Sequence, residues 1–393
     1  MTFREKILPQ PSLGFFNHST GEFQTDIVSE LRAGLWQSYN IDNRLYNDSI
    51  GEMRITEWRE LFPGITPIMP GFRYDAVAKK MEEDRFVPRQ REMSMKLFLE
   101  TVERYFARFE GKKIGVHLSG GLDSSLIIVL LRHFGIPFNL YGMVNDRYEF
   151  RTERRIQDLL APLGEKTVYV DVEEHPFYNL LDKYPFHQIP DSYIKSIDTA
   201  TVIAESAGSD GVEVVFGGQG ADTLFVDEIL TEPGAVSFNI GNEFAVPWEQ
   251  DLIYRPRGVE LVSFYGDPEI IEAIYNLRLG KGEDAWKLWA RNFFKEFLPR
   301  ELSEYHYVAD FNGLSLSGLE QAKPTVARLF EEAYDLIKHP IFSPENTRVM
   351  RETNVFEFDY KLYTAYCARI SIAVWLHALF EHEHYEHTLS SHL

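Results

Sequence analysis

The stretch GKKIGVHLSGGLDSSLIIVLLRHFG, residues 111–135, places a polar, glycine-rich turn between two apolar runs. IGVHL is typical of a buried strand, and LDSSLIIVLLRHFG is typical of a helix. A glycine turn that joins such a strand directly to a helix indicates the carboxyl edge of a parallel sheet, where open α/β folds bind their ligands. This turn restricts the fold class more than any other feature of the chain.

The middle of the chain alternates between strand-like and helix-like patterns. FNLYGMV, KTVYVDV and VEVVFGG are apolar runs of strand length, and RTERRIQDLLAPLG has helical spacing. Strands that alternate with helices of about 10–15 residues predict an α/β fold, a parallel sheet with crossover helices. A further helix is predicted before the glycine turn from apolar residues at steps of three and four, namely Met95, Phe98, Val102, Tyr105 and Phe109.

Beyond about residue 265 the pattern is mainly helical. EIIEAIYNLRLG, DAWKLWARNFFKEFL (residues 284–298) and PTVARLFEEAYDLIKH (from Pro324) have helical spacing, and a last long helix is expected from about residue 356. The run ERRIQD, residues 153–158, is expected to form the exposed face of a helix. The sequence therefore predicts a helical C-terminal part that follows the sheet.

The residues of the glycine turn indicate an anion site. Gly120 and Gly121 permit backbone conformations and close approaches that a side chain would forbid. A helix that starts near Asp123 directs its free amides and the positive end of its dipole into the turn, which suits phosphate. Hydroxyl donors are added by Ser119, Ser124 and Ser125. The Asp123 carboxylate repels phosphate, so it indicates a bridging Mg²⁺ ion. The alternative is an ordinary capped helix after a glycine turn.

The overall composition excludes some classes of function. The net charge of −20, from 60 acidic and 40 basic residues, disfavours a sequence-independent nucleic-acid binder. The one cysteine, Cys367, permits no internal disulfide and is expected to be a buried apolar residue. No apolar run has the length of a membrane span, and MTFREKILPQPS lacks the pattern of a signal peptide. We therefore expect a cytoplasmic protein that binds neither membrane nor nucleic acid.

The motif SGGLDSS resembles the PP-loop of the N-type ATP pyrophosphatases. These enzymes split ATP into AMP and pyrophosphate to adenylate a substrate, and they include asparagine synthetase, GMP synthetase and NAD synthetase. The motif is not of the Walker type, because no GK[ST] follows it. The resemblance implies an adenine nucleotide alpha hydrolase-like fold, with ATP and Mg²⁺ as cofactors.

A second stretch, VEVVFGGQGADTLF at residues 212–225, is similar to the asparagine synthetase segment LSGEGSDELFGGY and to the GxGAD form of β-lactam synthetase. On that resemblance Asp222 pairs with Asp123 as a Mg²⁺ ligand, and Gly217 and Gly218 line the nucleotide. Two carboxylates beside glycine turns suit a divalent cation on a departing pyrophosphate. The alternative for Asp222 is an aspartate that caps a turn or a helix.

Two further stretches resemble the asparagine synthetase-like family. GVELVSFYGDPEIIEAI, residues 258–274, is similar to the family pattern glEaRvPFlDpelvefa and keeps Glu260 and Asp267. KLWARNFFKEFLP, residues 287–299, is similar to KyLLReafrdlLP, so Lys287 matches the lysine that grips the triphosphate of ATP. The alternative for Lys287 is a solvated lysine on a helix face. The resemblance makes Glu260 and Lys287 candidate catalytic residues.

The resemblance covers roughly residues 90–310 and implies an asparagine synthetase-like ATP-pyrophosphatase domain over residues 86–393. On the family pattern, the adenine lies near the strand end YGMV, where the backbone of Met143 and Val144 offers contacts. The implied nucleotide-binding residues are Leu118, Ser119, Gly120, Gly121, Asp123, Ser124, Met143, Val144, Gly217 and Gly218.

Residues 1–85 resemble a reduced form of the family's N-terminal glutaminase domain. ELFPGITPIMPGFRYD, residues 60–75, is similar to the segment that closes that domain. Thr2 stands where the glutaminase has its cysteine nucleophile, and no cysteine precedes Cys367. The resemblance therefore predicts a small, degenerate glutaminase-like domain that releases no ammonia from glutamine.

Two positions depart from the family near the reacting group. Gln219 stands where asparagine synthetases have Glu and β-lactam synthetase has Tyr, beside the acyl-adenylate. Tyr307, with its neighbour His306, falls where the family has a lysine that stabilises charge at the reacting carbonyl. A neutral tyrosine can donate a hydrogen bond to an oxyanion but supplies no full charge. Either one of these residues substitutes for the lysine, or the amide-forming step has been altered or lost.

We predict an ATP-dependent ligase that adenylates a carboxylate and forms an amide or lactam with the amine of a small-molecule or peptide substrate. Because no glutaminase is expected, the amine is external or part of the substrate, as in β-lactam synthetases and lasso peptide cyclases. That analogy favours peptide or natural-product biosynthesis, with pathway partner proteins.

Two other functions stay open. One is a catalytically impaired nucleotide-binding partner protein, and the other is another PP-loop adenylating enzyme such as a tRNA-modifying enzyme. At the C-terminus, HALFEHEHYEHTLSSHL is more typical of a solvated helix end than of a zinc site built by His382, His384 and His387.

Overall fold

The structure of the chain is a computed structural model. It describes residues 15–17, 20–24, 65–67, 72–75, 77–83, 88–145, 151–184, 194–226, 249–279, 287–304, 312–338, 340–358 and 360–390. Within the first 85 residues it contains short antiparallel strands, namely β1 (Phe15–Asn17), β2 (Glu22–Gln24), β3 (Ile65–Pro67), β4 (Phe72–Asp75) and β5 (Lys80–Glu83). The domain boundary near residue 85 stays a prediction.

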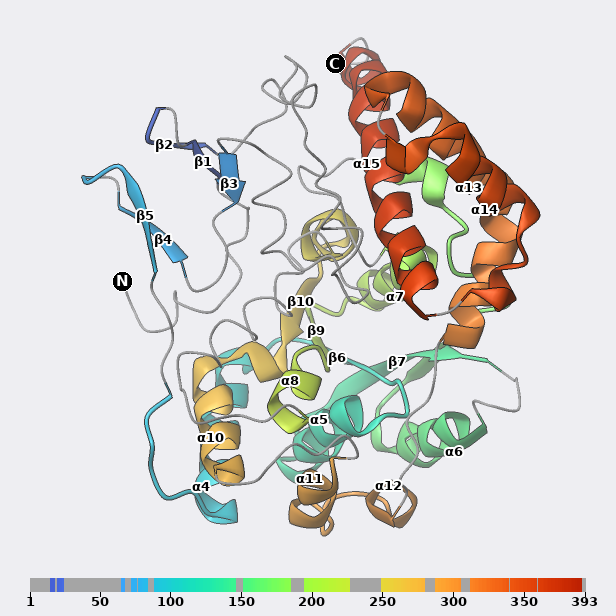
Figure 1. The fold of residues 1–393 in the computed structure, drawn as a ribbon. Helices are drawn as coiled ribbons and strands as arrows, with labels where there is room; N and C mark the ends of the chain where they lie inside the picture. Colours follow the sequence, from blue (N-terminus) through green and yellow to red (C-terminus); the bar gives the residue numbers. More distant parts are fainter. Residues whose placement is uncertain are drawn as a thin grey trace.

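A five-stranded parallel sheet lies at the centre of the described part of the chain (Figure 1). Its strands are β6 (Ile114–His117), β7 (Phe138–Val144), β8 (Thr167–Asp171), β9 (Val214–Gly217) and β10 (Glu260–Ser263). The spatial order is β10-β9-β6-β7-β8, and every neighbouring pair is parallel. The chain therefore starts in the middle, adds two strands on one side and returns to add two on the other. Ligands bind at the carboxyl edge of such a sheet where the order reverses, which here is between β6 and β9.

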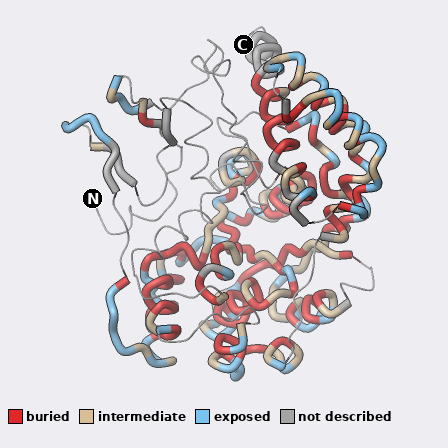
Figure 2. The backbone as a smooth tube through the Cα atoms, in the orientation of Figure 1, coloured by how far each residue is buried: buried red, intermediate tan, exposed pale blue. Residues whose placement is uncertain are grey.

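Helices cover both faces of the sheet. They are α4 (Met95–Phe106), α5 (Leu122–His133), α6 (Arg151–Leu160), α7 (Ile197–Ser209), α8 (Ala221–Phe225), α10 (Pro268–Arg278), α11 (Leu288–Phe293), α12 (Arg300–Glu304), α13 (Asn312–Ile337), α14 (Pro344–Glu352) and α15 (Tyr360–Ser390). Alternate residues of β9 enter two different cores, Val214 and Phe216 in one and Val215 in the other. The first core contains residues of α4, α5, α10 and α11, and the second contains residues of α7, α13 and α15. Figure 2 shows buried residues in both layers.

The apolar run that follows the glycine turn forms the buried helix α5. Every residue from Ser124 to Leu131 is buried. A helix that is apolar nearly all round belongs in a protein interior, so α5 fixes the turn that precedes it. The predicted α/β class, the parallel sheet and the helical C-terminal part are confirmed.

Two helix boundaries differ from the predictions. The helix α11 begins only after Lys287, which has a φ of +54°. The helix α13 begins at Asn312, so Pro324 lies inside it instead of at its first turn. Proline normally starts a helix because it lacks an amide donor. In α13 the buried apolar residues on both sides of Pro324, such as Leu319 and Val326, outweigh that preference.

No helix in the described part of the chain combines the length and the apolar character that a membrane span requires.

Candidate functional site

The turn between β6 and α5 is held by hydrogen bonds among its own serines. Ser119 Oγ and Ser124 Oγ are 2.8 Å apart, and the amide of Gly121 donates to Ser119 Oγ at 3.2 Å. Ser125 Oγ donates to the carbonyl of Gly121 at 2.5 Å. These bonds fix the turn beside the first amides of α5, which have no acceptor within the helix. The geometry suits an anion.

Two glycines allow this turn to pack against its neighbours. Gly120 has a φ of +80°, and a Cβ there would lie 2.5 Å from the carbonyl oxygen of Glu153. A Cβ at Gly218 would lie 3.2 Å from Asp123 Cβ and 3.2 Å from the amide nitrogen of Ser124. The two glycine turns recognised in the sequence therefore contact each other.

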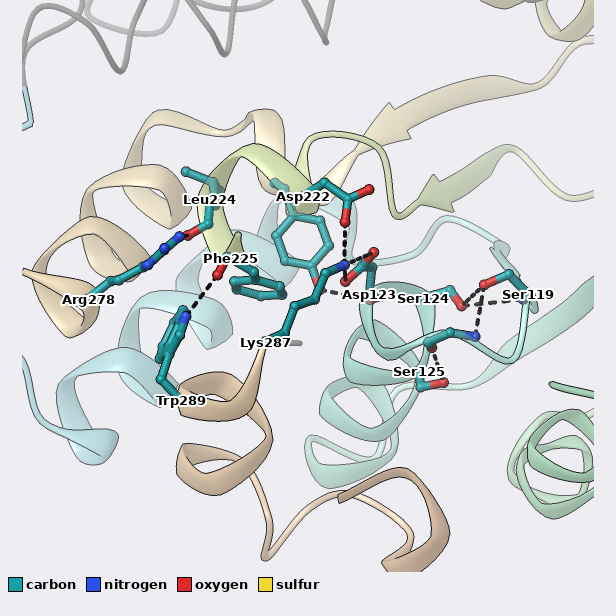
Figure 3. A network of polar contacts seen from close by, with 12 residues as sticks. Ser119, Asp123, Ser124, Ser125, Asp222, Leu224, Phe225, Arg278, Lys287 and Trp289 are labelled. Carbon is teal, nitrogen blue, oxygen red and sulfur yellow. Dashed lines mark hydrogen bonds and ion pairs between the residues drawn. The ribbon is translucent and has the colours of Figure 1, made fainter. Parts of the chain in front are cut away.

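Asp123, Asp222 and Lys287 meet at the carboxyl edge of the sheet (Figure 3). Lys287 Nζ lies 2.7 and 2.8 Å from the two carboxylate oxygens of Asp123 and 2.5 Å from Asp222 Oδ1. Asp123 is in the first turn of α5, Asp222 is in the first turn of α8, and Lys287 immediately precedes α11. Two separate segments of the chain thus supply the carboxylates, and a third supplies the cation that binds both.

Burial controls the electrostatics of this acid–lysine cluster. The side chains of Asp123 and Lys287 are 22% and 12% exposed, whereas that of Asp222 is 71% exposed. Desolvation raises the pKa of Asp123, Lys287 opposes the rise, and Asp222 adds to it. Burial acts to lower the pKa of Lys287, but the two carboxylates outweigh it and leave that pKa raised. When both acids are ionised, the cluster carries a surplus negative charge that another cation would offset.

Two aromatic residues that sequence reasoning missed support the cluster. Tyr265 donates a hydrogen bond from its hydroxyl to the carbonyl of Asp123 at 2.7 Å. Its ring meets the ring of Phe225 edge-on at 5.3 Å, and Lys287 Nζ lies 5.9 Å from the centroid of Phe225. The available signal was their position within the two family-like stretches, at residues 212–225 and 258–274.

A pocket lies beside the glycine turn, at the carboxyl ends of β6 and β7. It is partly open to solvent and brings Ser119 together with Met143 and Val144. Its other lining residues are Asn145, Glu153, Arg154, Gln157, Val172 and Leu314. A partly apolar pocket beside an anion site has the character expected for the nucleoside part of a nucleotide.

The helix α6 supplies two buried polar side chains to this pocket, so the expectation that ERRIQD is an exposed face was wrong. Glu153 is 9% exposed and Gln157 is 2% exposed. Gln157 Nε2 donates to the carbonyl of Leu118 at 2.9 Å and to that of Met143 at 2.8 Å, which joins the ends of β6 and β7. Desolvation raises the pKa of Glu153. These two polar residues, four apart, lie on the side of α6 that faces the sheet.

Glu260 is not part of the acid–lysine cluster. It opens β10 at the amino end of the strand, where Lys112 Nζ lies 3.3 Å from its carboxylate. Parallel strands share one carboxyl edge, so Glu260 lies at the edge opposite to Asp123. Asp267, from the same family-like stretch, caps the first turn of α10 and forms a salt bridge with Arg108. The structure gives Asp267 a supporting position.

Gln219 lies in the second glycine turn, three residues before Asp222. Its carbonyl accepts a hydrogen bond from Ser263 Oγ at 2.8 Å, and its side-chain amide lies against Gly217, where an added Cβ would require the amide to shift. Its amide is neutral and can donate or accept a hydrogen bond but cannot act as a base. The other predicted positions lie outside the described side chains, namely His306, Tyr307, His382, His384 and His387.

His117, the last residue of β6, was also missed by sequence reasoning. Its Nε2 lies 2.7 Å from the hydroxyl of Tyr254, and burial lowers its pKa to about 4. It points away from the core that holds its neighbour Val116, because successive side chains of a strand alternate between faces. The imidazole is therefore a neutral polar group on the side of the sheet that α7, α13 and α15 cover.

The donor set fits Mg²⁺ only in part. Carboxylate oxygens are ligands of the kind that Mg²⁺ prefers, and Asp123 and Asp222 already share one cation. No group of three His, Cys, Asp or Glu side chains that could hold a metal ion exists among the described residues. Because Mg²⁺ takes six ligands, phosphate oxygens and water would have to supply the remainder. The residues fit a metal that binds together with a nucleotide.

Comparison with known proteins agrees with these observations. Residues 96–232 match the family model of asparagine synthase. This range contains both glycine turns and both carboxylates, and it ends before Lys287. A stretch of 166 residues is 29% identical to a protein of Methanocaldococcus jannaschii described as a candidate glutamine-hydrolysing asparagine synthetase. The match covers 42% of this chain and 26% of that protein, so the chain spans about a quarter of the length of this curated relative.

Two solved structures are similar over much of their length. An NMN synthetase from Francisella tularensis is 12% identical, with 66% of this chain and 94% of that chain covered and a TM-score of 0.33. An NAD⁺ synthetase from Burkholderia pseudomallei is 14% identical, with 58% and 86% covered and a TM-score of 0.25. The assignment of the fold rests on the strand order and the layers described above.

Proposed function

Residues 96–232 are an asparagine synthase-type segment, and on this premise we propose that the chain is an ATP-dependent ligase that joins a carboxylate to an amine. The observation that carries the proposal is the meeting of Asp123, Asp222 and Lys287 beside an anion-binding turn. Turns of this kind bind phosphate through amides and hydroxyls, and paired acids with a lysine suit a phosphate chain that carries a metal ion.

In the proposed reaction a substrate carboxylate attacks the α-phosphorus of ATP, and the bond from that phosphorus to pyrophosphate breaks. An amine then attacks the acyl carbon of the adenylate, AMP leaves, and the amine gives up a proton. Mg²⁺ held by Asp123, Asp222 and phosphate oxygens would neutralise charge on the departing pyrophosphate. Lys287 would bind the same phosphates, and the amides and serines of the first glycine turn would orient them.

The pocket at the ends of β6 and β7 is the proposed place of the nucleoside. It adjoins Ser119 of the anion-binding turn and is lined by Met143 and Val144. The carbonyl groups of Leu118 and Met143 already accept hydrogen bonds from Gln157, so the ends of β6 and β7 are held together before any ligand binds. A preformed pocket lowers the ordering cost of binding.

We propose that the amine does not come from glutamine hydrolysed at Cys367. A thiol nucleophile needs a lowered pKa and access to solvent. Cys367 lies 3.3 Å from the hydroxyl of buried Tyr178, and burial raises the pKa of its thiol. An external amine, or one carried by the acid itself, fits better. By analogy with β-lactam synthetases and lasso peptide cyclases, we propose a peptide or natural-product substrate.

The test is ATP–pyrophosphate exchange with a panel of amino acids, hydroxy acids and short peptides. We expect exchange in the wild type, and a loss of about 10²–10³-fold in Lys287→Met, because one preorganised charge is removed from the phosphates. Lys96→Met, an exposed lysine on α4, is the matched control and should retain full exchange. Equal exchange in the wild type and Lys287→Met would rule out the proposed role of the cluster.

A second candidate function is nucleotide binding without turnover. It is supported by Gln219, because a neutral amide stands where a base would be expected beside the reacting group. Binding of ATP with Mg²⁺, measured by calorimetry, together with no AMP formation for any acid on the panel, would favour this candidate over the ligase.

A further inference from the structure

The helix α8, which carries Asp222, is too short to hold its own position. It has five residues, Ala221–Phe225, and begins after Gly220, whose φ is +84°. Isolated helices of fewer than about 12 residues are marginal in water, and the last carbonyl groups of any helix have no partner within it. The position of the Asp222 carboxylate therefore depends on what binds the two ends of α8.

Two side chains from other elements bind three successive carbonyl groups at the end of α8. Figure 3 shows Arg278 beside Leu224 and Trp289 beside Phe225. Arg278 Nη1 donates to the carbonyl of Leu224 at 2.8 Å, and Arg278 Nη2 donates to that of Val226 at 2.7 Å. Trp289 Nε1 donates to the carbonyl of Phe225 at 3.0 Å. Three donors from α10 and α11 thus bind the carbonyl groups at the end of α8, which lack amide donors within so short a helix.

The burial of Arg278 indicates that its charge serves this contact. The residue is fully buried, with an exposure of 0%. Burying a guanidinium costs several kcal/mol unless its donors are bound, and an apolar side chain would fill the same space without that cost. The negative end of the α8 dipole is the favourable place for such a cation. Unlike methionine or leucine, an arginine here can donate hydrogen bonds to the carbonyl groups of both Leu224 and Val226.

The hold on α8 is connected to the rest of the acid–lysine cluster. Trp289 is two residues after Lys287, so one indole links the segment of Lys287 to the helix of Asp222. The Trp289 ring also meets the ring of Phe225 edge-on at 5.5 Å. Tyr265 anchors the other acid, through its hydrogen bond to the carbonyl of Asp123. The backbone segment that carries each acid therefore has its own anchor outside the cluster.

We infer that Arg278, with Trp289, is a positioning residue that sets the distance between the Asp222 and Asp123 carboxylates for a shared metal ion. The inference rests on the proposed function, because the metal is part of that proposal. Arg278 does not line the nucleoside pocket, and the carbonyl groups that it binds belong to Leu224 of α8 and to Val226 directly after it. Its loss should weaken metal binding and leave binding of the bare nucleotide in place.

The first test measures Mn²⁺ by electron paramagnetic resonance, as a probe for Mg²⁺, in the presence of ATP. We expect the half-saturating Mn²⁺ concentration to rise about tenfold in Arg278→Met, as is typical when an outer partner of a metal ligand is removed. Binding of ATP in the presence of a chelator should stay within about twofold. Arg278→Lys keeps the charge and one donor group, and should restore part of the affinity. Arg300→Met, at an exposed pair with Glu304, is the matched control and should show no change.

The second test measures hydrogen exchange of the amides of residues 222–226 without any ligand. We expect faster exchange in Arg278→Met and, to a smaller degree, in Trp289→Phe, which keeps an aromatic ring at this position but loses the indole N–H donor. If Arg278→Met fails to fold, Trp289→Phe takes its place in both tests. An unchanged Mn²⁺ midpoint in a folded variant overturns the inference, whether or not exchange is faster. A wild type that binds no Mn²⁺ with ATP overturns the proposed function instead, and the exchange data then judge the anchoring of α8 alone.

Discussion

At the scale of single residues, Lys287 places its ammonium where a metal ion would contact both acids. Its φ of +54° costs a residue with a side chain roughly 1 kcal/mol, and close contacts with both carboxylates offset that cost. We expect Lys287→Met to bind Mn²⁺ at least about fivefold more tightly than the wild type when no nucleotide is present, because the acids lose their internal cation. Electron paramagnetic resonance of Mn²⁺ without ATP measures this, and equal affinities would show that lysine and metal do not compete.

His117 is the residue from which we expect a pH-dependent stability. Its pKa falls from 6.5 to about 4 on folding, so between these values the unfolded chain binds a proton that the folded chain does not. The associated stability is fully present above about pH 6.5 and is lost as the pH falls toward 4, by up to roughly 3 kcal/mol. Urea unfolding at about pH 7.5 and pH 5 should show a smaller difference in His117→Gln than in the wild type. The exposed His133→Gln is the control, and an equal reduction there would count against the assignment.

At the scale of elements, the junction of β6 with α5 and α6 depends on Gly120. We expect Gly120→Ala to destabilise the fold by more than Gly111→Ala, although their φ angles of +80° and +81° are nearly the same. A Cβ at Gly111 meets nothing within 4 Å, so that variant bears only the backbone cost of about 1–2 kcal/mol. A Cβ at Gly120 would also press on the backbone of α6 and add about 1–3 kcal/mol. Chemical denaturation of both variants checks the ranking, and equal losses would contradict the packing argument.

The elements also show which parts of the site a sequence can reveal. SGGLDSS and GGQGAD each hold their glycines and acid within a few residues, so local spacing is enough to recognise both turns. Gln157 and Arg278 act on carbonyl groups far along the chain, and nothing next to them in sequence marks those partners. Glu260 shows the opposite error, because its stretch resembles the family but the residue opens β10 at the wrong edge of the sheet for the site.

At the scale of the whole molecule, the alternation of strands and helices predicted the parallel sheet, and the order of its strands had to come from the structure. The short apolar run that became β9 does not say on which side of β6 it pairs. Its place between β6 and β10 creates the reversal of strand order on which the acid–lysine cluster lies. Long-range pairing of this kind depends on packing across both cores, which local patterns do not record.

Among the described residues of the helical C-terminal part, Leu314 of α13 lines the proposed nucleoside pocket. We expect Leu314→Ala to weaken ATP binding by about tenfold, because part of the apolar wall is removed. Leu329→Ala, on the same helix and 1% exposed, should lower the free energy of unfolding by about 2–5 kcal/mol and leave the dissociation constant for ATP unchanged. Calorimetric titration with ATP, beside urea unfolding of both variants, separates the two effects. Similar losses of ATP affinity in both would mean that α13 acts through stability alone.

The burial of α5 limits which positions of the molecule can change during evolution. Every residue from Leu126 to Leu131 is buried, so a changed residue there disturbs the packed interior. Asp222 lies in the first turn of the short helix α8, and Lys287 immediately precedes α11. Under the proposed function, new acids and amines would be accommodated from the side of α8 and α11 and from the pocket wall, while the glycine turn before α5 stays unchanged.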